Sequence, residues 1–486
     1  MRARPEEAGR RLAQAPAVAA VRGALAGGPP AWVVGGAVRD AVLGRPVGDI
    51  DLAVDGDPRE VAAAIARACG GSSFELSAEF GTWRAVRGSG GWQVDVARLR
   101  GGSLESDLAA RDFTIGAVAV PLGGGPPVDP LGGIPDIEAG VLRVAGPGSF
   151  AEDPLRLLRA ARLVSQLGLA VEPSTAELAR SESGRAGEPA GERQLAELRL
   201  LVGGPDPVRG LALMDELGVT APVLPELEAL KGVEQNRNHH LDVHRHTIAV
   251  LERLLEVEAD LERFAGPGAP AAAALLGEPL ADGFTRGEAL RFGAVVHDLG
   301  KPATRGEWEG GVTFIGHDRA GAEIVGKMMG RLRASRRLTR HLEALTLHHL
   351  RLGFLVHERP LGPRAVHRYL RATEPVTVDV TLLTAADRLA ARGSGPIASE
   401  EAVEAHLGLV REMLAPALEW RRQGPPEPLL RGDELAGELG LAPGPELGRL
   451  LGELEEAQYA GEVADRDAAV AFARELLATD RASGAR

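Results

Sequence analysis

Cysteine is almost absent from this sequence: Cys69 is the only cysteine among 486 residues. A single cysteine excludes an intramolecular disulfide framework and is typical of a protein in a reducing cytoplasm. No run of about 18 apolar residues occurs, so the sequence predicts no membrane-spanning helix. The basic, alanine-rich start is broken by charged residues, and it therefore predicts an amphipathic helix and not a targeting segment.

Aromatic residues are also scarce, at 3%, and an excess of basic charge is missing altogether. The net charge of −13 argues against nucleic-acid binding by the whole surface, so any basic interface has to be local. With 44% hydrophobic and 25% charged residues, the composition is that of a globular protein. A chain of 486 residues favours about two to four domains.

The first part of the chain, to about residue 145, alternates strand-like apolar runs with glycine-rich turns and helical stretches. This pattern predicts a mixed α/β domain. The expected strands are AWVV (31–34), DIDLAV (49–54), TWRAVR (82–87), QVDVARL (93–99) and TIGAVAV (114–120). From Glu152 onward the apolar residues recur at helical spacing, as in segments 153–169 and 192–204.

Three stretches rich in proline and glycine interrupt this pattern. The first, 121–136, predicts a connection out of the sheet. The second, 265–283, lies inside a later helical region and predicts a surface insertion. The third, 421–433, predicts a boundary before a C-terminal helical segment.

Two carboxylates lie in a predicted strand with one residue between them. Asp49 and Asp51 therefore point to the same face, where they repel unless a cation lies between them. Hard oxygen ligands suit Mg²⁺ that also contacts substrate phosphates, although an isolated Asp-x-Asp is equally consistent with a solvated strand end. Asp95, on another predicted strand, is a candidate third carboxylate or a solvated residue. Before them, Gly35 and Gly36 form a strand-to-helix turn that lets a phosphate approach the backbone.

Four motifs in fixed order resemble the class II tRNA nucleotidyltransferase and poly(A) polymerase family. They are GGAVRDAVLGRPVGDIDLAV (35–54), ARDFTIGAVAV (110–120), VDPLGGIPDI (128–137) and EDPLRLLRAARL (152–163). The resemblance implies an α+β fold with a polymerase-β-like nucleotidyltransferase head, followed by all-helical neck, body and HD domains. The expected segments are a head (1–145), a neck with the base-reading helix (146–206), a body that binds RNA (207–240), an HD domain (241–400) and a helical tail (401–486).

The family resemblance also assigns the site residues of the head. Asp49 and Asp51 become Mg²⁺ ligands, with Asp95 as the third catalytic carboxylate. The implied nucleotide-binding residues are Gly35, Gly36, Arg39, Arg111, Asp112, Asp153, Arg156, Arg159 and Arg162. The implied reaction transfers CMP or AMP from CTP or ATP to the 3′ end of tRNA and releases pyrophosphate.

Asp153 and Arg156 are three residues apart on a predicted helix and thus share a face. A carboxylate accepts from the exocyclic amino group of cytosine or adenine, and an arginine donates to a ring nitrogen or carbonyl. The pair would then select C and A without a template. The alternative is an ordinary salt bridge between the two side chains, with Asp153 capping the helix.

The chain departs from the family pattern in two places. Ala110 and Gly116 stand where the family has arginine and asparagine. In addition, only RGGSLES separates Leu99 from Asp107, where many complete CCA-adding relatives carry a longer flexible segment. The short form resembles enzymes that add only CC.

A second set of residues resembles the HD phosphohydrolase superfamily. His246, the adjacent pair His297 and Asp298, and Asp387 form its H…HD…D pattern. Further implied ligands are His317 and His349, with His348 as the alternative to His349. Imidazole and carboxylate ligands suit Mg²⁺, Mn²⁺, Ni²⁺ or Fe²⁺, and the implied activity is hydrolysis of phosphate esters at RNA ends. The lone histidines His240 and His367 are better explained by helix packing.

The segment RLRASRRLTR (331–340) holds five arginines in ten residues. It is a candidate contact for RNA phosphates, or else a solvated helix face. The expected partners are tRNA, CTP and ATP, with no membrane, and no oligomeric state is predicted. The competing functions are a bacterial poly(A) polymerase, and an HD phosphohydrolase whose head only binds RNA.

Overall fold

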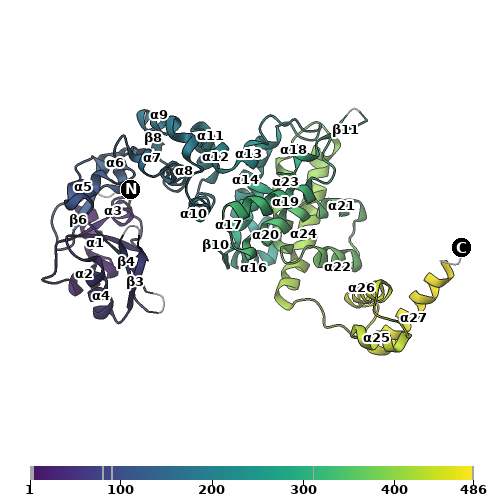
Figure 1. Cartoon of the computed structure of the whole chain (residues 1–486). Coiled ribbons are helices and arrows are strands. Elements are labelled where there is room, and N and C mark those ends of the chain that lie inside the picture. The colour runs from purple at the N-terminus through teal and green to yellow at the C-terminus, as the bar shows by residue number, and fades with distance from the viewer. Residues whose placement is uncertain (1–4, 79–80, 89–90, 310, 484–486) are drawn as a thin grey trace. The chain divides into compact units, whose positions relative to one another are not determined.

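The computed structural model describes residues 5–78, 81–88, 91–309 and 311–483. These residues form two compact units (Figure 1), of which the first ends at Val223 and the second begins at Leu224. Within the described ranges, no helix is both long and apolar enough to cross a membrane.

The first unit is built around a six-stranded mixed sheet. Its strands are β1 (Ala31–Val34), β2 (Ile50–Val54), β3 (Ser72–Ser77), β4 (Thr82–Val86), β5 (Gln93–Arg98) and β6 (Ala119–Pro121). They lie in the order β3-β4-β5-β2-β1-β6, and β2 pairs with β5 in parallel while the other neighbours are antiparallel. Strands β3, β4 and β5 follow one another in sequence, whereas the pairs β2–β5 and β1–β6 bring together segments that are far apart in the chain.

One row of this sheet carries charge. Arg84 on β4 is the cross-strand partner of Asp95 on β5, and Asp95 is the partner of Asp51 on β2. Asp51 in turn pairs with Val34, the last residue of β1. Side chains in one row of a sheet share a face, so the register itself places two carboxylates side by side at the end of β1.

Helices of the first unit pack on the sheet and continue into a helical neck. Those of the head are α1 (Pro5–Gln14), α2 (Pro16–Ala24), α3 (Gly36–Val42), α4 (Pro58–Cys69), α5 (Leu104–Ala109) and α6 (Gly133–Ala139). Those that follow are α7 (Ser149–Glu152), α8 (Leu155–Leu167), α9 (Pro173–Glu182), α10 (Gly191–Val202), α11 (Pro207–Glu216) and α12 (Thr220–Val223). A short parallel pair, β7 (Val141–Leu142) with β8 (Ala170–Val171), flanks α7 and α8 in the sequence. Helix α8 packs between α10 and α11 with most of its leucines buried.

The strand predicted at 114–120 is only partly correct. Residues Thr114–Gly116 form a 3₁₀ turn, and β6 covers only Ala119–Pro121. The hydroxyl of Thr114 donates to Asp136 at 2.6 Å, and its backbone N–H donates to the carbonyl of Arg143. These bonds turn the chain away from the sheet, so the apolar run is buried without strand pairing.

Strand β3 (Ser72–Ser77) has no counterpart among the predicted strands. Its sequence, SSFELS, has only two apolar residues, Phe74 and Leu76, and both are exposed because β3 is an edge strand with mostly exposed side chains. The other four predicted strands are present as β1, β2, β4 and β5.

The second unit is almost entirely helical. Its longer helices are α14 (Val243–Ala259), α16 (Ala269–Leu276), α17 (Arg286–Val296), α19 (His317–Arg331), α20 (Arg336–His348), α22 (Pro363–Ala372), α23 (Thr377–Ala390), α24 (Glu400–Gln423), α25 (Gly432–Leu439), α26 (Pro445–Tyr459) and α27 (Arg466–Ser483). The shorter elements are α13 (Pro225–Glu228), α15 (Leu261–Ala265), α18 (Lys301–Thr304), α21 (Arg351–Phe354) and two hairpins, β9 (Pro279–Ala281) with β10 (Phe284–Thr285) and β11 (Gly306–Trp308) with β12 (Gly311–Thr313).

The stretch 265–283 is not the simple surface insertion that its composition predicts. It contains α16, in which Ala272, Leu275 and Leu276 are buried. Alanine has the highest helix propensity, and this overrides the flanking glycines and prolines. The stretch 421–433 does separate the C-terminal helices, since α24 ends at Gln423 and α25 begins at Gly432. Helices α25 to α27 enclose a core of their own that includes Leu435, Leu450 and Ala473.

A glycine allows two segments of the second unit to touch. A Cβ on Gly300 would lie 2.1 Å from the carbonyl oxygen of His317 and 2.5 Å from the backbone nitrogen of Gly321. Both neighbours are backbone atoms of the first turns of α19, so they cannot rotate away. The chain after Asp298 therefore reaches the start of α19 only because residue 300 has no side chain.

We expect Gly300→Ala to lower the stability of the second unit by about 1–3 kcal/mol, as overpacking at rigid backbone does. Scanning calorimetry of the full chain should show its transition fall by roughly 2 °C or more. The matched control is Gly330→Ala, near the far end of α19, where a Cβ meets nothing within 4 Å. Equal behaviour of the two variants would contradict this account.

Candidate functional sites

A cavity of about 750 Å³ lies in the first unit, beside the charged row of the sheet. Every nucleotide-binding residue predicted from the motifs lines it. These are Gly35, Gly36, Arg39, Arg111, Asp112, Asp153, Arg156, Arg159 and Arg162. Of the three predicted catalytic carboxylates, Asp51 lines the cavity, while Asp49 and Asp95 adjoin Asp51 from outside the lining.

The Gly35–Gly36 turn lies directly against Asp51. Gly35 has a φ of +71°, and a Cβ there would come 3.2 Å from both Asp51 Oδ2 and Arg111 Nη1. Residue 35 is therefore glycine for two reasons, its left-handed backbone and the close approach of two charged groups. The turn leaves the strand end open to the cavity.

The carboxylate of Asp51 is crowded by negative charge. Its burial against the surrounding strands, followed by the charges of Asp95 and Asp49, raises its pKa, and the nearby Arg111 only partly opposes this. Part of the Asp51 side chain faces the cavity, so a carboxylate that is partly removed from water can still be reached by a ligand. The carboxylates of Asp49 and Asp51 are hard oxygen donors whose negative charge is not balanced, and such donors fit a divalent cation.

Arg84 is a site residue that the sequence motifs did not indicate. It holds Asp95 in a two-pronged ion pair, with Nε at 2.6 Å from Oδ1 and Nη2 at 2.8 Å from Oδ2. Asp95 is thus neutralised within the protein, whereas Asp49 and Asp51 are not paired in this way. Only the strand register relates Arg84 to Asp95, since no sequence spacing does so.

The short segment 100–106 is held in place by hydrogen bonds to Asp107, the residue that follows it. Asp107 is 3% exposed and accepts hydrogen bonds from Arg111 Nη2 at 2.9 Å and from the backbone of Arg100 at 3.3 Å. Arg100 also donates to the carbonyl of Ala110. The start of the segment is therefore bound to the Asp107 carboxylate, which also binds Arg111, and Arg111 lines the cavity.

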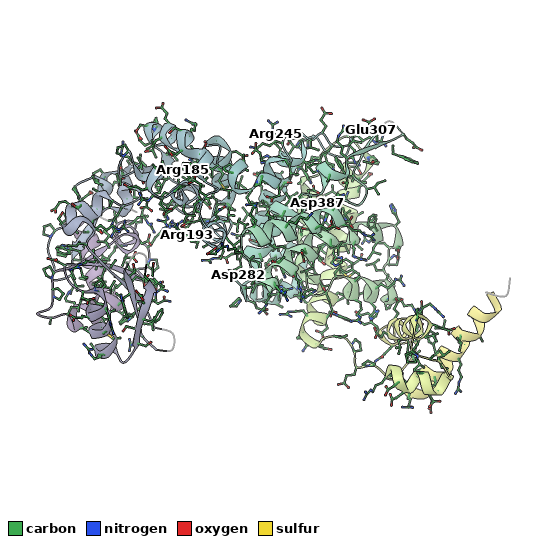
Figure 2. All side chains as sticks on the ribbon, viewed as in Figure 1. Arg185, Arg193, Arg245, Asp282, Glu307 and Asp387 are labelled. Atoms are coloured by element: carbon green, nitrogen blue, oxygen red, sulfur yellow. The ribbon has the colours of Figure 1, made fainter. Side chains whose placement is uncertain are left out.

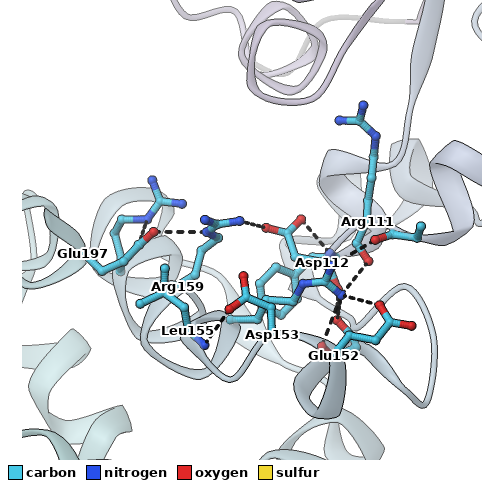
Figure 3. Close-up of polar contacts among 12 residues, drawn as sticks. Arg111, Asp112, Glu152, Asp153, Leu155, Arg159 and Glu197 are labelled. Carbon is cyan, nitrogen blue, oxygen red and sulfur yellow. Dashed lines mark hydrogen bonds and ion pairs between the residues drawn. The ribbon is translucent and has the colours of Figure 1, made fainter. Parts of the chain in front are cut away.

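A chain of ion pairs crosses the floor of the cavity (Figure 3). Arg159 on α8 donates to Asp112 at 3.0 Å and to Glu197 on α10 at 3.1 Å, and Arg162 lies 2.8 Å from the other oxygen of Glu197. Burial raises the pKa of Asp112, but the charge and hydrogen bond of Arg159, together with the backbone N–H of Phe113 and the charge of Arg156, outweigh it, so the pKa is lowered and the carboxyl is held ionised. Glu197 is a second residue that the motifs did not indicate.

Asp153 and Arg156 do not form the salt bridge that their spacing allows. Asp153 accepts from Arg193 of α10 at 2.8 Å and from the backbone of Leu155 at 3.3 Å. Arg156 donates to Ser149 Oγ at 2.8 Å and to the carbonyl of Ala110 at 2.9 Å. The two side chains line the same cavity but are anchored independently, and Arg193 is a third residue that the motifs missed.

The predicted HD ligands come together in the second unit as two groups of three. His246, Asp387 and His297 form one, and Asp298, His317 and His349 form the other, with the candidate ligand atoms of each group within 4.8 Å of one another. Asp387 lies among the helices of this unit (Figure 2). His349 is the group member and not His348, whose Nδ1 instead accepts from Arg351 at 2.9 Å.

Three of these histidines are oriented in the same way. The Nδ1 atoms of His297, His317 and His349 lie 2.8, 2.7 and 2.6 Å from the carbonyl oxygens of residues 294, 314 and 346, each three positions earlier. Such a bond fixes Nδ1 as the donor and leaves Nε2 as a lone-pair donor for a metal. Burial lowers the pKa of His349 to about 4, so this ring stays neutral near pH 7. The donor set fits divalent metal ions.

Other side chains adjoin the two groups. Lys301 Nζ lies 2.6 Å from Asp298 Oδ2 and donates to Gln235 at 2.7 Å. The ring of His239 stacks edge-on against His246, with centroids 4.5 Å apart. Sequence reasoning did not select these three residues, although the run at 235–240 that supplies two of them is rich in polar residues.

Comparison with known proteins identifies the parts of the chain. Residues 31–143 match the Poly A polymerase head domain family, 168–231 match the probable RNA and SrmB-binding site of polymerase A, and 243–392 match the HD domain family. An A-adding tRNA nucleotidyltransferase of Deinococcus radiodurans is 37% identical over 91% of this chain and 95% of its own length. The chain belongs to the tRNA nucleotidyltransferase family.

Other members of the tRNA nucleotidyltransferase family are similar over nearly the same length. A CC-adding tRNA nucleotidyltransferase of Thermus thermophilus is 34% identical over 91% of this chain and 92% of its own. The Thermotoga maritima CCA-adding enzyme, solved with tRNA, covers 97% of this chain and 98% of its own with a TM-score of 0.62. At 21% identity this last likeness shows the fold alone.

The predicted family and the predicted α+β fold, with a polymerase head followed by helical domains, are confirmed. Use of divalent metal is supported by the head and HD families and by the two ligand groups. The boundaries of the five segments and the roles of individual residues stay predictions.

We expect Arg193→Ala to lower discrimination between nucleotides about five- to tenfold, because Asp153 loses the partner that fixes its carboxylate, worth about 1 kcal/mol at this partly exposed site. Stability should change little. The measurement is incorporation of UTP and GTP relative to CTP and ATP. Arg199→Ala, on the same helix but outside the cavity lining, is the control, and an equal effect of both changes would refute the assignment.

Proposed function

We propose that this chain adds nucleotides to the 3′ end of tRNA without a template, using CTP or ATP. The observation that carries the proposal is the joint presence, in one cavity, of Asp51 at the open strand end and the anchored pair Asp153 and Arg156. The first suits phosphoryl chemistry and the second suits reading of a base. The relatives named A-adding and CC-adding tRNA nucleotidyltransferases support the substrate class. These substrates make the cytoplasm the proposed location.

In the proposed reaction the 3′ oxygen of the RNA forms a bond to the α-phosphorus, and the bond from that phosphorus to the pyrophosphate leaving group breaks. Asp49 and Asp51 would hold Mg²⁺, with Asp95 beside them. The bound ion supplies Lewis-acid stabilisation of charge on the phosphates. Arg39 and Arg111 line the same cavity and provide positive charge for a triphosphate.

We propose Asp153 as the acceptor for the exocyclic amino group of cytosine or adenine, and Arg156 as the donor beside it. Guanine and uracil present a carbonyl oxygen where these bases present the amino group, so a carboxylate disfavours them. The ion pair with Arg193 fixes the orientation of the Asp153 carboxylate. Base choice then depends on protein side chains alone.

We further propose that this chain completes only part of the CCA end. The segment 100–106 is short, and buried Asp107 ties it to Arg100 and Arg111, so the cavity has one anchored arrangement. The relatives that match over about nine-tenths of this chain are named for adding A or CC, which is consistent with one arrangement.

The test is extension of tRNAs that end before the CCA, after the first C and after CC, with CTP, ATP or both, resolved by length. We expect addition that stops after CC or that begins only on the CC-ending tRNA. A complete CCA contradicts partial addition, and long adenylate tails would indicate a poly(A) polymerase.

Asp51→Ala should reduce this addition by about 100-fold or more, since several kcal/mol of charge stabilisation is lost. Asp55→Ala is the matched control, because Asp55 follows the same strand but does not line the cavity. Full extension by Asp51→Ala would refute the assigned role of the carboxylate.

We propose in addition that the HD groups hold one or two divalent ions, chosen from Mg²⁺, Mn²⁺, Ni²⁺ and Fe²⁺, and hydrolyse phosphate esters at RNA ends. The shared orientation of His297, His317 and His349 supports metal binding, because each Nε2 is left as a donor. With Asp298 and Asp387 they supply the mixed imidazole and carboxylate set typical of hydrolytic centres.

Hydrolysis of a 2′,3′-cyclic mononucleotide should require one of these ions and fall by about 100-fold or more in Asp298→Ala. That variant should still extend tRNA, while Asp51→Ala should still hydrolyse the cyclic phosphate. Each variant is thus the control for the other. Turnover that persists after removal of all divalent metal would contradict the metal assignment.

A further inference from the structure

The turn between α19 and α20 gathers five exposed arginines. We call this group the arginine corner; it consists of Arg331, Arg333, Arg336, Arg337 and Arg340. The opposite face of α20 buries Leu338, Leu342 and Leu345 against the unit. The arginines therefore do not fill the core, and their side chains reach solvent.

The corner carries positive charge that the protein does not neutralise in full. Arg331 pairs with Glu226 at 2.7 Å. Over residues 311–483 and the other described ranges, no ion pair joins Arg336, Arg337 or Arg340 to a carboxylate. The nearby acid Asp282, labelled in Figure 2, accepts instead from the backbone N–H of Ser335.

Helix stability does not account for this placement. The first turn of α20 has no acidic residue, and Arg336 and Arg337 are its first two residues. The positive end of the helix dipole disfavours cations there. Three exposed arginines at this end, in a chain of net charge −13, indicate a surface that meets anions.

The same helical hairpin links the corner to the HD groups. Helix α19 begins at His317, and His349 follows directly after α20, so two of the three ligands of the second group lie at the opposite end from the arginines. At 1.5 Å per residue, the ligand end lies roughly 13–20 Å along the axis from Arg340 and Arg336. A stacked strand advances about 3.4 Å per nucleotide, so this span corresponds to about four to six nucleotides.

We propose that the arginine corner binds the phosphate backbone of an RNA whose 3′ end reaches the HD groups. Guanidinium groups match phosphate oxygens in paired hydrogen bonds and stay charged at all relevant pH values. The arginine corner binds the RNA without sequence specificity and contacts its backbone about five nucleotides from the end that is hydrolysed. This inference rests on the HD activity proposed above for its catalytic consequence, but not for RNA binding itself.

The test compares a 2′,3′-cyclic mononucleotide with a 12-nucleotide RNA that ends in the same cyclic phosphate. In Arg336→Glu/Arg340→Glu, KM for the RNA should rise about tenfold or more, and the salt dependence of log KM should weaken by about 1.4 in slope, as expected for two lost phosphate contacts. Turnover of the mononucleotide should stay within about twofold of wild type, because it is too short to reach the corner.

The matched control is Arg422→Glu/Arg431→Glu, which changes net charge equally at arginines whose side chains are 69% and 79% exposed. Anisotropy measurements of the dissociation constant for the same 12-mer, across a salt series, decide the proposal even if wild type hydrolyses neither substrate. Equal binding by wild type and the corner variant would overturn it, as would an equal loss in the control. Competition by poly-glutamate as strong as that by RNA would overturn the assignment to RNA.

Discussion

Two carboxylates held side by side impose the main constraint on the head of this protein. The parallel pairing of β2 with β5 makes Asp51 and Asp95 direct neighbours, and like charges in that position repel. Only one of the two carboxylates is neutralised by an ion pair of this kind, Asp95 by Arg84. The unbalanced charge at Asp51 faces a cavity, beside a glycine turn and Arg111. Strand register, glycine and arginine thus all serve one requirement, an acidic strand end that a cation and a triphosphate can neutralise together.

The rest of the cavity depends on helices that belong to no single motif. Asp112 comes from the loop after α5, Arg159 from α8 and Glu197 from α10, yet their ion pairs form one continuous chain. Burial raises the cost of charging Asp112 and Arg159, so each depends on the other to remain charged. The strand end that carries Asp51 and helix α8 are therefore held at a common cavity by electrostatics as well as by packing.

Sequence analysis identified most of this arrangement because the relevant residues are close together along the chain. Asp49 directly precedes β2, which carries Asp51, and Asp153 lies two residues before α8, which carries Arg156, Arg159 and Arg162. Their short separations in sequence keep them together although each set extends beyond one element, and the family resemblance assigned their roles. The partners supplied by distant elements could not be found in this way. Arg84 meets Asp95 only through strand register, and Arg193 meets Asp153 only because α10 packs on α8. The strand expected at 114–120 failed for a related reason, since a hydrogen bond from Thr114 to Asp136 decided the local geometry.

Helix α10 has an evolutionary consequence. It supplies the partners of two cavity residues, Arg193 for Asp153, which we propose reads the base, and Glu197 for Arg159, although it lies outside the four motifs. A descendant that kept every motif and changed only this helix would present a differently held carboxylate to the incoming base. If Asp153 reads the base as proposed, substitutions in α10 alone can change nucleotide preference while every motif is kept.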